Sequence, residues 1–222
     1  MSARMNVRMN AGMSTPFERR LWGLVVACVA AAIVAHLAAD ATVARAAQAN
    51  RLVESQVLQW TTEFGEAIWW LVPAGVVFAV AAAQKRHNLA RWAFAVIAAV
   101  GGSGLLVNGL KFVFGKSRPR LLFEEGRLDF TPFSYGHAVN SFPSGHATTC
   151  AAATVILSLA LPRWRAVLLP LGFLLALTRV AIHAHYLSDV CAGFALGTAC
   201  ALLTLRVWRA RWPENVPKSL SM

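Results

Sequence analysis

The chain has 222 residues, of which 57% are hydrophobic and only 14% are charged. Soluble proteins carry about a quarter charged residues, so this composition excludes an ordinary soluble domain and indicates an integral membrane protein. The net charge of +11 would suggest a nucleic-acid-binding protein if the chain were soluble. In a membrane protein the same charge does not require nucleic-acid binding, because cytoplasmic segments collect Lys and Arg.

Six apolar stretches approach the roughly 20 residues that a helix needs to span the hydrocarbon core. Backbone groups inside a bilayer must be satisfied within the segment, so these stretches are expected to be helices. The sequence therefore predicts an all-α membrane bundle of six transmembrane helices, forming one domain over residues 1–222. The fourth and fifth stretches are short and would span only with flanking residues. The expected spans are 21–39, 67–83, 92–114, 147–161, 166–180 and 187–207.

The distribution of Lys and Arg predicts the orientation of this bundle. If the N-terminus is cytoplasmic, 13 of the 21 basic residues fall in the tails (about 1–20 and 208–222, with Arg206 just before the second tail) and in the second and fourth connections. This positive-inside pattern predicts that both termini are cytoplasmic and accounts for most of the basicity without nucleic acid. Six of the remaining basic residues cluster where apolar runs end on the outer side: Lys111, Lys116, Arg118, Arg120, Arg127 and Arg179.

The first outer connection carries a helical apolar pattern. Val53, Val57, Trp60 and Phe64 recur at spacings of three and four. This pattern favours a helix lying at the membrane surface. Simple membrane-anchoring aromatic residues would produce the same composition.

Three polar clusters lie at the outer ends of the predicted helices. Helix counting places all three on one side of the membrane. They read Lys111-x6-Arg118-Pro119, Pro143-Ser144-Gly145-His146 and Thr178-Arg179-x5-His185-x3-Asp189.

The chemistry of the first two clusters and of Arg179 is that of a phosphate site. Lys111, Arg118 and Arg179 supply three positive charges, and guanidinium groups match the geometry of phosphate oxygens. Ser144 and the Gly145 backbone N–H lie at a helix start, where free amides and the helix dipole favour an anion. Several converging donors could stabilise a phosphoryl transition state.

The third cluster suggests a nucleophile. His185 and Asp189 are four residues apart and would share one helix face. A carboxylate bonded to one ring nitrogen fixes the tautomer and leaves the other nitrogen as a nucleophile. His146, in the other half of the site, is then the natural general acid. Alone, a His-x3-Asp pair is more often a local hydrogen bond than a catalytic dyad.

Together the three clusters resemble the tripartite signature of the type 2 phosphatidic acid phosphatase superfamily, KxxxxxxRP, PSGH and SRxxxxxHxxxD. By that resemblance His185 would form a phosphohistidine, Asp189 would orient it and His146 would be the acid. The resemblance assigns phosphate binding to Lys111, Arg118, Ser144, Gly145 and Arg179. There are two departures. Thr178 replaces the usual Ser and keeps the hydroxyl, and Leu187 stands where many members have Pro.

No metal or other cofactor is expected, because Asp189 is the only acidic residue in a motif and the cationic cluster would repel a divalent ion. The four cysteines lie in apolar runs without metal-ligand spacing and are read as small buried hydrophobes. His183 lies near the expected nucleophile but matches no motif position, which favours a structural role. His137 would either touch a substrate head group or lie in a solvated loop.

These features predict an enzyme that hydrolyses a lipid phosphate or diphosphate at the periplasmic side of a bacterial inner membrane. Its partners would be a phospholipid or polyprenyl phosphate substrate and membrane lipids. By resemblance the candidates are undecaprenyl diphosphate, phosphatidylglycerophosphate, phosphatidic acid and lipid A phosphates. The alternatives are a lipid phosphotransferase of the same superfamily and a non-catalytic membrane scaffold. Six apolar spans exclude a soluble haloperoxidase with the same phosphate chemistry. The sequence indicates no oligomeric state.

Overall fold

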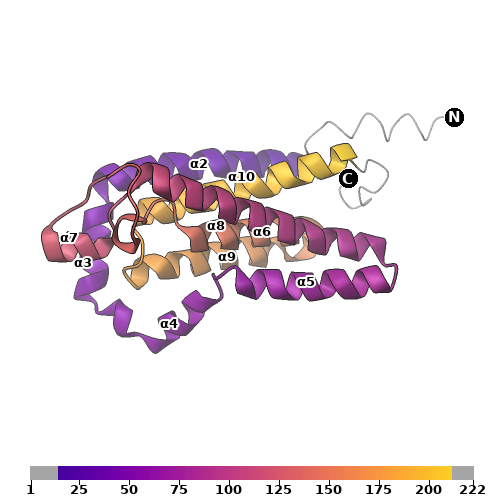
Figure 1. Ribbon diagram of the computed structural model, residues 1–222, viewed down its shortest axis with the longest axis horizontal. Coiled ribbons are helices and arrows are strands. Elements are labelled where there is room, and N and C mark those ends of the chain that lie inside the picture. The colour runs from indigo at the N-terminus through magenta and orange to yellow at the C-terminus, as the bar shows by residue number, and fades with distance from the viewer. Residues whose placement is uncertain (1–14, 212–222) are drawn as a thin grey trace.

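The computed structural model describes residues 15–211, which form a bundle of helices (Figure 1). This part of the chain contains no β-strand, and its one isolated β-bridge joins Lys116 to Phe130. The expected all-α bundle is therefore confirmed. The α-helices are α2 (Pro16–Ala38), α3 (Asp40–Ala49), α4 (Gln56–Glu63), α5 (Ile68–Ala83), α6 (His87–Phe114), α7 (Pro119–Glu125), α8 (Gly145–Ala160), α9 (Arg165–Ala181) and α10 (Leu187–Arg211). Three 3₁₀ turns, η1 (Leu52–Glu54), η2 (His137–Val139) and η3 (Pro162–Trp164), connect them.

The expected membrane spans are all helical. Five stretches of the described residues are long and apolar enough to cross a membrane. The sixth, α8, is apolar but has only 16 residues. It begins at Gly145, earlier than expected, because the Ser144 hydroxyl caps its first turn by accepting a hydrogen bond from the Ala147 N–H. The long stretches are Pro16–Ala38, Gln56–Ala83, His87–Phe114, Pro162–Ala181 and Leu187–Ala210. The second of these includes α4, the turn at residues 64–67 and the 16-residue α5.

Helix α8 is the centre of the bundle. Its Ala151, Val155 and Ile156 side chains have no exposed surface, because α6, α9 and α10 pack around it. Helix α2 packs against α10, and α5 packs against α6. The peripheral helices expose large apolar side chains, such as Leu37 of α2, which is 78% exposed. Such exposure suits a surface that faces lipid.

Two glycines of α10 allow it to pack closely against α8. A Cβ at Gly193 would lie 2.4 Å from the Ser144 carbonyl oxygen, and one at Gly197 would lie 2.1 Å from that of Thr148. Larger residues could not occupy these positions without separating the helices. The close approach lets the Ser144 N–H donate to the Asp189 carbonyl at 3.0 Å, and so joins two of the three motifs.

The first outer connection forms α3, η1 and α4. The helix expected there is present as α4, whose Val57 and Trp60 side chains are each 76% exposed. Thr62, on another face, is buried. Helices α3 and α7, which the sequence pattern did not predict, lie at the end of the bundle opposite the start of α2 and the end of α10 (Figure 1). Residues Arg4, Arg8 and Lys218 of the expected cytoplasmic tails lie outside the described residues.

Candidate active site

The three motifs meet at the end of the bundle where α3 and α7 lie. Their side chains come from four helices, from the residues just before α7 and α8, and from the turn between α9 and α10. In the first motif, Lys111 is in the last turn of α6 and Arg118 precedes α7. In the second, Ser144 precedes α8, and Gly145 and His146 begin it. In the third, Arg179 is in the last turn of α9, His185 is in the turn before α10, and Asp189 is in the first turn of α10.

Three cations form one side of the site. Lys111, Arg118 and Arg179 lie close enough to repel one another electrostatically. Arg118 donates to the carbonyl oxygens of Ala184 (3.3 Å) and Asn140 (3.4 Å). Burial and the nearby Arg179 lower the pKa of Arg118 to about 10, which still leaves it charged at neutral pH.

The two arginines keep unused hydrogen-bonding capacity. Arg179 donates from Nη1 to the Thr62 hydroxyl of α4 at 3.1 Å. Within the described residues neither Arg118 nor Arg179 has a salt bridge, and the buried Nε of each has no hydrogen-bond partner. Buried donors of this kind normally find an acceptor. Phosphate oxygens are acceptors that match two guanidinium groups and an ammonium.

The start of α8 faces the same cations. A Cβ added to Gly145 would lie 3.6 Å from the Lys111 Nζ, so the backbone of the first helical turn lies beside that ammonium. The Ser144 side chain is fully buried, and its hydroxyl caps its own helix. The Gly145 backbone and the α8 dipole remain suited to an anion placed between them and the cations.

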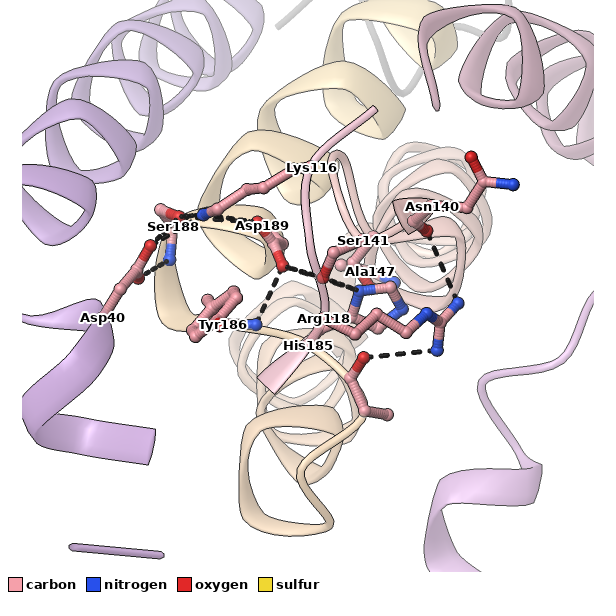
Figure 2. Close-up of polar contacts among 12 residues, drawn as sticks. Asp40, Lys116, Arg118, Asn140, Ser141, Ala147, His185, Tyr186, Ser188 and Asp189 are labelled. Carbon is pink, nitrogen blue, oxygen red and sulfur yellow. Dashed lines mark hydrogen bonds and ion pairs between the residues drawn. The ribbon is translucent and has the colours of Figure 1, made fainter. Parts of the chain in front are cut away.

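His185 and Asp189 are adjacent, with a serine hydroxyl between them (Figure 2). The His185 Nδ1 lies 3.7 Å from the Asp189 Oδ2, which is an ion-pair distance and too long for a hydrogen bond. Ser141 donates to that oxygen at 2.5 Å, and its Oγ lies 3.4 Å from the His185 Nδ1. The Tyr186 N–H also donates to it, at 2.8 Å. Burial lowers the pKa of His185 to about 4, so the ring is neutral at neutral pH.

His146 lies opposite, under the turn that follows α4. It is close enough to Arg179 and His185 to interact with both electrostatically, and its buried Nε2 has no hydrogen-bond partner. A Cβ at Gly65 would lie 2.7 Å from the His146 Cδ2, so the turn between α4 and α5 closes over this ring. The first outer connection is therefore part of the site.

Several polar residues around the site were not among those predicted from the motifs. Lys116 had been noted only as one of six clustered basic residues, and the position of Ser141 just before the PSGH motif was the only signal for it. No sequence pattern linked the others to the site. These residues are Asp40, Thr62, Lys116, Ser141 and Ser188.

His183 and His137, which the motifs left unassigned, lie beside the site. His183 has a φ of 59° and packs edge-on against the Phe123 ring at 5.3 Å. His137 is exposed in η2, and the positive charge of Arg118 lowers its pKa. In the part of the chain that the structure describes, no group of three or more His, Cys, Asp or Glu side chains could hold a metal ion.

Comparison with known proteins gives concordant matches. The PAP2 superfamily model matches residues 92–213. Lipid A 1-phosphatases of Rhizobium etli and Rhizobium johnstonii are 45% and 44% identical to this chain over 106 residues. Those matches cover 48% of this chain and 46% and 43% of the relatives, so the matched segment is less than half their length.

Two solved structures share the fold at 22% sequence identity. A transmembrane PAP2-type phosphatidylglycerolphosphate phosphatase from Bacillus subtilis gives a TM-score of 0.61, over 88% of this chain and 96% of that one. LpxE of Aquifex aeolicus gives a TM-score of 0.52, over 67% of this chain and 83% of that one. The long apolar helices and the match to a transmembrane phosphatase together show that the protein is an integral membrane protein. Because the family model matches more than half of its length, the chain belongs to the PAP2 superfamily.

Proposed function

We propose that this protein hydrolyses a lipid phosphate through a phosphohistidine formed on His185. The observation that carries the proposal is the neutral, buried His185 ring beside three cations, two of which, Arg118 and Arg179, have no salt-bridge partner in the described residues. A neutral imidazole has a free electron pair for attack, and the cations stabilise the charge of a transferring phosphoryl group. We also propose that residues 1–222 act as one catalytic domain.

In the first step the His185 Nε2 attacks phosphorus and the bond from phosphorus to the lipid oxygen breaks. The Nδ1 proton stays on the side of Asp189 and Ser141, where the carboxylate stabilises the positive charge that develops on the ring. The leaving lipid oxygen takes a proton from His146. The bound phosphate supplies the negative charge that lets His146 hold that proton among the cations.

In the second step a water molecule attacks phosphorus and the bond from phosphorus to Nε2 breaks. His146, now neutral, accepts the proton from the water. Inorganic phosphate leaves, and His185 returns as a neutral ring. Lys111, Arg118, Arg179 and the Gly145 N–H bind the phosphate oxygens in both steps. None of the roles proposed for these residues requires a metal ion.

Two relatives named as lipid A 1-phosphatases make a lipid A phosphate the first substrate to test. Undecaprenyl diphosphate, phosphatidylglycerophosphate and phosphatidic acid are the other candidates. The elements that carry the motifs begin or end at one end of the bundle (Figure 1). We propose that this position brings the site within reach of a lipid phosphate at the membrane surface. We place that end at the periplasmic side of a bacterial inner membrane.

The test is phosphate release by the purified protein in detergent and EDTA, from a panel of these four lipids. We expect release from lipid A that persists in EDTA and is abolished in His185→Ala. The variant should still elute as a folded protein and bind vanadate, because the cations remain. Wild-type release by His185→Ala would overturn the nucleophile assignment. Loss of activity in EDTA, restored by one divalent ion, would overturn the metal-free mechanism.

A further inference from the structure

Lys116 is fully buried although it belongs to none of the three motifs. Lysine is almost never fully buried unless it is paired. Its Nζ donates three hydrogen bonds, to the Asp189 Oδ1 (2.9 Å), the Asp40 Oδ2 (2.7 Å) and the Ser188 Oγ (2.7 Å) (Figure 2). The Tyr186 ring lies below the ammonium, 4.6 Å from Nζ to the ring centroid.

These contacts fix Asp189 from the side opposite His185. The Oδ2 of Asp189, which faces His185, accepts from Ser141 and the Tyr186 N–H, whereas Oδ1 accepts from Lys116. A carboxylate bonded at both oxygens cannot rotate without breaking one set of bonds. Asp189 has no exposed surface, so the Lys116 ammonium also replaces the hydration that this charge has lost.

The backbone of Lys116 supports the same arrangement. Its carbonyl oxygen accepts a hydrogen bond from the Ser141 N–H at 3.0 Å. Lys116 therefore fixes Asp189 through its side chain and Ser141 through its backbone. Polar atoms of these two residues lie 3.7 Å and 3.4 Å from the His185 Nδ1.

We propose that Lys116 is a positioning residue for His185 and acts through Asp189. It keeps the Asp189 carboxylate ionised and turned toward the Nδ1 proton, so that Nε2 keeps the electron pair for attack. It does not bind the phosphate, because all three of its protons are used inside the protein. This inference rests on the proposed phosphohistidine mechanism.

The rival explanation is that Lys116 serves only as the counter-ion of buried Asp40. The side chain of Asp40 has no exposed surface and lies in α3, which also reaches the site through Ser188. Removing one member of a buried ion pair leaves an unpaired charge. Lys116→Met would then damage the fold, and any loss of activity would be indirect. A second substitution at Asp40 separates the two explanations.

The experiment compares Lys116→Met, Asp40→Asn and the double variant with the wild-type protein, using lipid A in detergent. Asp40→Asn leaves the Lys116–Asp189 contact in place, so we expect its kcat to remain within about threefold of wild type. The double variant has no orphaned Asp40 charge but still lacks the Lys116 ammonium. We expect it to lose about 10- to 100-fold in kcat, with KM changed little because the phosphate-binding cations are intact. Lys116→Arg, which keeps the charge, should recover part of the loss.

A double variant that regains the kcat of Asp40→Asn would overturn the proposal, because Lys116 would then be needed only to neutralise Asp40. This comparison decides the question even if Lys116→Met alone fails to fold. A rise in KM with unchanged kcat would also overturn it. Failure of the proposed function is distinguished by His185→Ala. If that variant stays active, the mechanism is wrong. If it is inactive while the double variant matches Asp40→Asn, only the role of Lys116 is wrong.

Discussion

At the scale of single residues, the proposed chemistry depends on keeping one histidine neutral. His185 is 2% exposed, and its loss of solvent outweighs the attraction of the Asp189 carboxylate for a ring proton. Lys111 and Arg118 also face the ring, and their charges disfavour protonation further. The environment that buries His185 therefore keeps it in the neutral form that the proposed attack on phosphorus requires.

This environment predicts the pH dependence of the free enzyme. With a pKa of about 4, His185 stays neutral from neutral pH down to about pH 5 and becomes protonated as the pH falls through 4. The acid limb of kcat/KM should therefore lie well below pH 6.5, the ordinary value for histidine, once the ionisation of the substrate phosphate has been measured separately and subtracted. An acid limb centred near pH 6.5 would contradict this lowered pKa of His185.

The same shift has a consequence for stability. The unfolded chain holds the His185 proton more tightly than the folded one does, since the folded pKa lies below the unfolded value. His185 therefore makes the protein progressively less stable as the pH falls from about 6.5 toward 4. Assays below pH 5 need a parallel measurement of folding, so that loss of structure is not mistaken for loss of the nucleophile.

At the scale of elements, the sequence predicted the helices that apolar length alone determines. The spans at 21–39, 92–114 and 187–207 correspond to α2, α6 and α10. It did not predict α3 or α7, which are 10 and 7 residues long and carry mixed residues. Short helices of this kind are stabilised by tertiary contacts more than by local pattern. Local sequence could not reveal those contacts.

Helix α4 is an element whose role the sequence indicated only in part. Its exposed Val57 and Trp60 follow the apolar pattern, but the pattern did not show that Thr62 contacts Arg179 or that Gly65 packs on His146. Thr62 of α4 and Gly65 of the turn that follows it thus each reach a side chain of one motif, Arg179 and His146. The first outer connection therefore covers part of the site with one face and exposes apolar side chains on the other.

This packing gives a prediction with a matched control. Gly65→Ala would place a methyl group 2.7 Å from the His146 Cδ2, closer than real contacts allow, so the ring or the turn must move. We expect a fall of at least about tenfold in kcat. His146 is the proposed proton donor, and complete loss of general acid catalysis costs roughly 10²–10⁴-fold. Gly75→Ala, in α5, meets nothing within 4 Å and should leave activity unchanged. Equal activity in the two variants would show that the α4–α5 turn does not constrain His146.

At the scale of the whole molecule, the site joins residues that lie far apart in the sequence. The motif spacings predicted which residues meet: Lys111, Arg118, Arg179 and His146 interact electrostatically in the structure. The network that supports Asp189 was not predictable. Lys116 reaches Asp40 across 76 residues, and nothing in the local sequence of α3 marks Asp40 as its partner. Such pairs arise from how α3 folds back on the bundle, which requires the three-dimensional structure.

The orientation of the bundle in the membrane remains a prediction from the Lys and Arg distribution. All three motifs lie at one end of the helices, and the basic connections lie at the other, where α5 joins α6 and where Glu18 of α2 pairs with Arg209 (Figure 1). If the positive-inside rule holds, the site faces the periplasm. A cysteine in place of the exposed Ala138, in η2, should then react with a membrane-impermeant thiol reagent in intact spheroplasts.

A cysteine in place of Gln84, which is exposed at the end of α5, should be protected until the membrane is opened. The native cysteines provide the background control. Cys28, Cys150 and Cys191 are buried and Cys200 is partly buried, so little labelling is expected without the substitutions. The two positions lie at opposite ends of α6, a helix of 28 residues that is long enough to separate them by a whole bilayer. The reverse labelling pattern would put the catalytic end in the cytoplasm. In that case the substrate would have to present its phosphate from the inner leaflet, and a role at the outer face would be excluded.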